Sequence, residues 1–151
     1  MDRPARLRLI LAAPVLGAVY YYLLIFLIGL TAATAWPSWW IGTLPNRHVA
    51  ELIWIIGSHT IGVFCAAVPS AFATVIVLRK QAMLLGIIVG VIATILAVLP
   101  SLTHDIWPLV WNNHPIFFIF DQVKQLAAVP AAIWIIRKLM PKSALPRAAF
   151  G

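Results

Sequence analysis

Four long apolar runs, separated by short polar segments, dominate the pattern of this chain. They cover about residues 9–31, 51–78, 82–99 and 116–136. Each run is close to or longer than the roughly 20 residues that a helix needs to cross a hydrocarbon core of about 30 Å. The pattern therefore predicts an all-α integral membrane protein. We expect a bundle of four transmembrane helices with short loops, forming a single domain over residues 1–151.

Composition supports a membrane setting. Of the 151 residues, 63% are hydrophobic and only 10% are charged, whereas soluble domains carry about 25% charged residues. The net charge of +7 does not indicate nucleic-acid binding, because the basic residues stand at the ends of the apolar runs and not on an aromatic and basic surface. The lipid bilayer is the expected partner, and no nucleic acid is expected.

The basic residues also predict the orientation. Cytoplasmic segments of membrane proteins are enriched in Lys and Arg, and the segments on one side of the four runs hold nine of the eleven basic residues. The loops on the other side hold only Arg47. We therefore expect a multi-pass protein of a bacterial-type cell inner membrane, with both termini cytoplasmic. The nine are Arg3, Arg6, Arg8, Arg79, Lys80, Arg137, Lys138, Lys142 and Arg147.

The first run has an alternative interpretation as a secretory signal. It follows three arginines and precedes Ala33-Thr34-Ala35, which resembles a cleavage site. Signal cores, however, are about 7–15 residues long, and this run is long enough to cross the membrane. A retained span is the expected form.

Small residues recur along the second and third runs. Faces of this kind let helix backbones approach closely in lipid, so we interpret them as packing surfaces. The Arg79–Gln81 turn between these runs is very short, which predicts that the two helices are antiparallel neighbours. In the first run, Tyr20, Tyr21 and Tyr22 fall near mid-span; bulky packing is their expected role, with at least one hydroxyl reaching another helix. The predicted packing residues are Ser58, Gly62, Ala66, Ser70, Gly86 and Gly90.

The fourth run contains a polar interruption. Asp121 and Lys124 are three residues apart and therefore neighbours on a helix. An ionisable side chain at membrane depth costs roughly 3 kcal/mol on insertion scales, so it normally faces protein. At 1.5 Å per residue, Asp121 and His59 both lie about 8–12 Å beneath the outer surface. We expect one polar cluster with Glu51 at its mouth, made of Ser58, His59, Thr60, Asp121, Lys124 and Gln125.

Two roles remain open for this cluster. Intramembrane Asp, His and Lys often carry protons or solutes, and histidine titrates near neutrality. The alternative is a satisfied ion pair with a hydrogen-bonded histidine that fixes helix register, which is the commoner situation. A third possibility, with the span starting deeper than Ile116, would make the pair interfacial.

Other chemistry is poorly supported. His48, His104 and His114 lack helical ligand spacing, and Cys65 is the single cysteine, so neither a metal nor another cofactor is expected. Ser58 and His59 point about 100° apart on a helix and do not form a dyad. The first span lacks the acid of small four-span drug exporters, and the aspartate motif of membrane signal peptidases is absent.

These observations favour a non-enzymatic function. The leading hypothesis is a small accessory or assembly subunit that acts through transmembrane helix contacts with another membrane protein or as a homo-oligomer. The rival is a small transporter or channel that uses Asp121, Lys124 and His59. A membrane enzyme ranks third.

Overall fold

The computed structural model describes residues 3–33, 37–103 and 115–139. These residues form four long helices, α1 (Arg3–Ala33), α3 (Arg47–Val77), α4 (Ala82–Thr103) and α6 (Pro115–Leu139), and the short helix α2 (Ser38–Ile41). Within these described ranges no residue belongs to a strand, and each long helix is long and apolar enough to cross a membrane. For the described residues, the all-α class is therefore confirmed, and so is the presence of four helices that could span a membrane. The close bundle and the orientation of the termini stay predictions.

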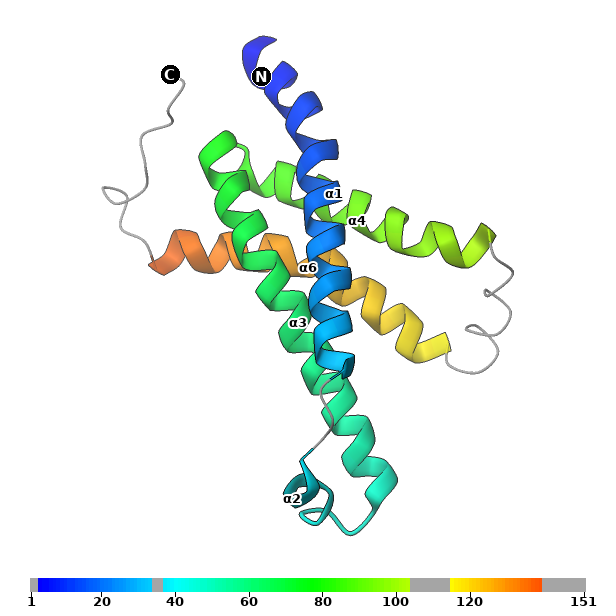
Figure 1. Cartoon of the computed structure of the whole chain (residues 1–151). Coiled ribbons are helices and arrows are strands. Elements are labelled where there is room, and N and C mark those ends of the chain that lie inside the picture. Colours follow the sequence, from blue (N-terminus) through cyan, green and yellow to red (C-terminus); the bar gives the residue numbers. More distant parts are fainter. Residues whose placement is uncertain (1–2, 34–36, 104–114, 140–151) are drawn as a thin grey trace.

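The long helices form two antiparallel pairs that cross each other. α1 lies beside α3, α4 lies beside α6, and Figure 1 shows the second pair running across the first. At the crossing, α1 packs on α4 and α3 packs on α6. The contacts therefore close a ring in the order α1, α3, α6, α4.

The predicted relation between α3 and α4 is wrong away from their turn. The two helices are consecutive, but they contact each other much less than either contacts its partners in the ring. Figure 1 shows them diverging from the turn that joins them. A short connection fixes where two helices meet and leaves their crossing angle to side-chain packing.

The two helix pairs differ in length. The apolar spans of α1 and α3 have 29 residues each, whereas those of α4 and α6 have 19 and 22. At 1.5 Å per residue the first two are about 44 Å long and the last two about 29–33 Å. Because the hydrocarbon core is about 30 Å thick, α1 and α3 are long enough to cross it with a tilt, whereas α4 and α6 are about as long as the core is thick.

Glycines mark the closest helix contacts. A Cβ at Gly17 of α1 would lie 2.6 Å from Ile92 of α4, and a Cβ at Gly90 of α4 would lie 2.7 Å from the carbonyl oxygen of Leu126 in α6. Gly62 of α3 faces the backbone of α1 at Leu27. Close approach at small residues is how helices associate in lipid. Of the six predicted packing residues, Ser58 is only half-buried, and the other five are buried inside this ring: Gly62, Ala66, Ser70, Gly86 and Gly90.

One end of the molecule collects positive charge. Arg137, near the end of α6, donates a hydrogen bond to the backbone carbonyl of Arg79 in the turn after α3. Arg8 of α1 lines a groove together with the last residues of α3. The start of α1, the α3–α4 turn and the end of α6 therefore meet. We call this region the basic end; it consists of Arg8, Arg79, Lys80, Arg137 and Lys138.

Candidate functional site

Helices α3 and α6 bring four of the predicted polar residues together. His59 and Thr60 belong to α3. Asp121 and Lys124 belong to α6, on the face that packs against α3. Both helices begin on the side of the molecule opposite the basic end, and each places its polar residues within its first half. The shared depth that the sequence predicts for His59 and Asp121 is therefore present in the structure.

An ion pair is the centre of this polar cluster. Lys124 Nζ lies 2.7 Å from Asp121 Oδ1, the length of a charge-assisted hydrogen bond. His59 Nδ1 lies 3.9 Å from the other carboxylate oxygen, Oδ2, which is too long for a hydrogen bond. Asp121 therefore binds Lys124 directly. A small rotation of the His59 side chain would bring its imidazole within hydrogen-bonding distance of the same carboxylate.

Lys124 has two further contacts. Its Nζ lies 3.5 Å from Thr60 Oγ1 and 4.9 Å from the centre of the Phe120 ring, within the range of a cation–π contact. The Thr60 hydroxyl donates to the carbonyl of Ile56 in its own helix at 2.6 Å, so its oxygen is oriented to accept from Lys124. The ammonium group is thus satisfied from α3 and α6 together.

Exposure differs between the two charges. The Lys124 side chain is only 10% exposed, whereas the Asp121 side chain is 35% exposed and that of His59 is 28% exposed. A nearly buried ammonium needs its partner, because a charge left alone in a low-dielectric interior is costly. The carboxylate and the imidazole, by contrast, are accessible from the surroundings. The arrangement can therefore stabilise the α3–α6 contact, while its carboxylate and imidazole stay open on one side.

Two predicted members of the cluster lie apart from it. Glu51 pairs with Arg47 of the same helix, with 2.9 Å between Glu51 Oε1 and Arg47 Nε. It is eight residues, about 12 Å along the helix, from His59. Ser58 donates to the carbonyl of Ile55 within α3. Four of the seven predicted residues therefore form the polar cluster: His59, Thr60, Asp121 and Lys124. Glu51 and Ser58 bond within α3, and Gln125 contacts α1.

Gln125 connects the polar cluster with α1. It is 6% exposed, and its backbone carbonyl accepts a 3.1 Å hydrogen bond from the hydroxyl of Tyr20. This bond confirms that one of the three mid-span tyrosines reaches another helix. The side-chain oxygen of Gln125 is buried and has no hydrogen-bond partner among the described residues. Gln125 also lines a cavity of about 430 Å³ with Tyr21, Ile28 and Pro100, which is large enough to hold water or a small donor.

Two of these interactions are not predicted by the hydropathy pattern. The Tyr20–Gln125 bond joins residues 105 positions apart, and only the unusual depth of the tyrosines hinted at it. The Arg47–Glu51 pair has the i, i+4 spacing of a helix, but the hydropathy pattern predicts that Arg47 lies in a loop. The structure starts α3 at Arg47 instead.

Metal binding finds no support in the part of the chain that the structure describes. No group of three or more His, Cys, Asp or Glu side chains there is placed to hold an ion. His104 and His114 fall in the segment 104–114, outside the described residues, and the His48 side chain is likewise outside. The expectation that these histidines hold no metal therefore stays a prediction.

Comparison with protein-family models, with curated proteins and with solved structures found no significant match to this chain.

Proposed function

We propose that this chain is a small, non-enzymatic integral membrane subunit that acts through transmembrane helix contacts with another membrane protein or with a second copy of itself. The observation that carries the proposal is the hydroxyl of Tyr22. It faces away from the other helices at a depth where lipid cannot accept its hydrogen bond.

Helix α1 is the most open of the four spans. Only 22% of its most apolar window is buried, compared with 44% for α3. Val19, Tyr22, Phe26 and Leu30 are all exposed, and their spacing of three, four and four residues places them along one side of the helix. We call these four residues the α1 stripe. Its spacing matches the seam by which one helix packs on another.

Tyr20 and Tyr22 form an internal comparison within this helix. Tyr20 is fully buried and donates to Gln125, whereas Tyr22 is 69% exposed. Among the described residues, none forms a hydrogen bond with the Tyr22 hydroxyl. Tyr22 lies nine residues before Thr31, about 14 Å along the helix, so it is inside the hydrocarbon. A partner helix with a carbonyl or hydroxyl acceptor would remove the cost of leaving this donor unpaired.

The small-residue faces of α3 and α4 do not support association with a partner. Gly62 packs on α1, while Gly86 and Gly90 pack on α6. These faces are used within the chain. The α1 stripe is the surface that we propose for a partner, because it carries the Tyr22 hydroxyl.

Association can be tested in mild detergent with variants of the α1 stripe. We expect Val19→Trp, which adds bulk to the stripe, to separate the chain from its partner or second copy. Ile61→Trp is the matched control, because Ile61 of α3 is 64% exposed and lies outside the stripe. Tyr22→Phe should weaken association about threefold, since hydrogen bonds between membrane helices contribute about 0.6 kcal/mol on average. A strictly monomeric wild-type protein with no co-purifying chain would contradict the proposal.

The proposed location is the cell inner membrane, with the basic end on the cytoplasmic side. Its support is the meeting of Arg8, Arg79 and Arg137 at one end of the helices, because positive residues are retained in the cytoplasm. Labelling of a cysteine introduced at Lys80, in a Cys65→Ser background, would test this. The label should react from the cytoplasmic side only.

A small transporter or channel is the second candidate. The specific observation in its favour is the open side of the polar cluster, where Asp121 and His59 are partly exposed beside the paired Lys124. The unpaired oxygen of Gln125 continues the polar groups toward the cavity beside α1. A pathway for protons would need such a succession of groups. Proton flux into liposomes, abolished by Asp121→Asn at normal protein levels, would favour this candidate.

A further inference from the structure

An apolar groove lies between the first half of α1 and the end of α3. It has a volume of about 430 Å³ and is lined by Arg8, Leu11, Ala12, Val15, Leu16, Ile76 and Val77. Leu11, Val15 and Ile76 are each about half exposed or more and form its rims, while Ala12, Leu16 and Val77 are half-buried and form its floor. The groove is therefore open toward the lipid along its length.

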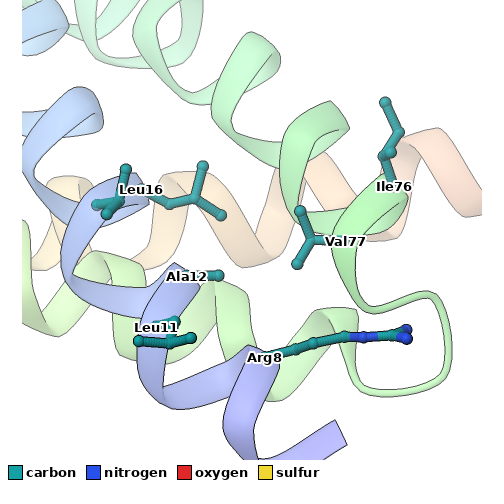
Figure 2. A pocket seen from close by; sticks show the side chains of 7 residues that line it. Arg8, Leu11, Ala12, Leu16, Ile76 and Val77 are labelled. Atoms are coloured by element: carbon teal, nitrogen blue, oxygen red, sulfur yellow. The ribbon is translucent and has the colours of Figure 1, made fainter. Parts of the chain in front are cut away.

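A positive charge stands at one end of this groove. Figure 2 shows Arg8 extending from α1 toward the chain that follows Val77. This turn after α3 contains Arg79 and Lys80, and Arg137 of α6 donates a hydrogen bond to the backbone carbonyl of Arg79. The two acidic residues that the structure describes, Glu51 and Asp121, lie in the opposite halves of α3 and α6.

The dimensions of the groove fit one hydrocarbon chain. From Arg8 to Leu16 is eight residues, about 12 Å along the helix, and one leaflet of the hydrocarbon core is about 15 Å deep. The groove's volume of about 430 Å³ suits one such chain, whereas a 12 Å length of helix about 10 Å wide occupies about 900 Å³. The occupant is therefore a single flexible chain whose charged group remains at the basic end.

We propose that this groove binds an anionic phospholipid of the surrounding leaflet. One acyl chain lies along Leu11, Val15 and Ile76, and the phosphate is held at Arg8. Guanidinium groups bind phosphate oxygens in a planar, two-bond geometry, and basic pockets between membrane helices are typical headgroup sites. The proposal concerns a different surface from the α1 stripe and does not depend on a protein partner.

Native mass spectrometry of the full chain in detergent tests the proposal. The probes are phosphatidylglycerol and phosphatidylcholine with identical acyl chains. We expect the wild type to bind one phosphatidylglycerol at least fivefold more tightly than phosphatidylcholine. Arg8→Gln should remove most of this preference, because one basic residue beside an anionic lipid contributes about a fivefold factor. Arg6→Gln is the matched control with the same loss of charge on the same helix, and it should change affinity less than twofold.

A second variant tests the apolar part of the groove without changing charge. Ala12→Phe fills the floor and should weaken the binding of both lipids. Its control is Ile10→Phe, because Ile10 is exposed outside the groove, and this control should bind normally. Equal wild-type affinity for the two lipids would overturn the proposal. Equal losses in Arg6→Gln and Arg8→Gln, with normal binding by Ala12→Phe, would also overturn it, because that result indicates general surface attraction.

Discussion

Helix α6 packs against two neighbours in two different ways. Its seam with α4 is apolar and close, with Gly86 facing Ile133 and Gly90 facing the backbone of Leu126. Its seam with α3 contains the polar cluster, in which Asp121 and Lys124 meet His59 and Thr60. The same helix thus uses close backbone contact on one side and hydrogen-bonded charges on the other.

The difference follows from the solvent. Lipid tails are as apolar as leucine, so apolar burial alone does not drive helices together in a membrane. The α4–α6 seam must gain its stability from fit, which depends on the absence of a side chain at Gly90. The α3–α6 seam gains stability from satisfying groups that lipid cannot solvate, and this depends on chemical identity. Steric changes should therefore damage the first seam most, and changes of charge the second.

The largest effect is expected from Gly90→Leu. Even the first carbon of the new side chain would lie 2.7 Å from the carbonyl oxygen of Leu126, and a backbone atom cannot move without displacing α6. Overpacking commonly costs about 1–3 kcal/mol and sometimes more, and we expect a loss above about 3 kcal/mol here. Thermal unfolding followed by size-exclusion chromatography in detergent should show little folded protein.

Gly57→Leu is the control for this experiment. No atom lies within 4 Å of a Cβ built at Gly57, and the residue is exposed in the middle of a helix. Leucine should be neutral or slightly stabilising there, because glycine inside a helix costs about 0.5–1 kcal/mol relative to alanine. Equal melting temperatures for the two variants would contradict the account of the α4–α6 seam.

A smaller effect is expected from Lys124→Met. The change leaves Asp121 without its 2.7 Å partner. Losing one member of a fully buried pair costs about 3–5 kcal/mol, but the Asp121 side chain is 35% exposed and can be partly solvated. We therefore expect a loss of about 2 kcal/mol in the free energy of unfolding, measured as a lower melting temperature in detergent.

The double variant Asp121→Asn/Lys124→Met distinguishes the roles of the pair. Because no unpaired charge remains, it should be more stable than Lys124→Met alone. If its protein level is normal and proton flux into liposomes is lost, transport becomes the better explanation of the polar cluster. Additive losses of stability in the double variant would mean that the two residues do not interact.

Much of this contrast was predictable from sequence. Hydropathy located the four spans, and the spacing of Asp121 and Lys124 predicted their contact, because both signals depend on local helix geometry. The rise of 1.5 Å per residue was enough to predict that His59 and Asp121 lie at the same level of their two helices. Small-residue spacing also identified Gly86 and Gly90 as packing positions.

Two features could not be predicted from the sequence, because they depend on how the helices cross: the separation of α3 and α4, and the direction in which each polar side chain faces. The Arg79–Gln81 turn suggested that α3 and α4 are neighbours, yet the structure places them mostly apart in the ring. Rotation about the helix axis also decided that Ser58 bonds within α3 while Thr60 faces Lys124. Neither crossing angle nor rotation is encoded in a hydropathy profile, since both result from the combined packing of all four helices.

The smallest effect, from Thr60→Val, tests how far the polar seam extends. Thr60 Oγ1 is 3.5 Å from Lys124 Nζ, at the limit of a hydrogen bond, and its proton is already donated to Ile56. Valine keeps the shape, and Lys124 keeps Asp121, so we expect a loss of about 0.5 kcal/mol or less. Thr74→Val is the matched control, because Thr74 donates to Ser70 within the same helix. A loss above about 1.5 kcal/mol for Thr60 alone would show that the ammonium group depends on α3 as much as on Asp121, and the charge effect of the polar seam would then be shared between both helices.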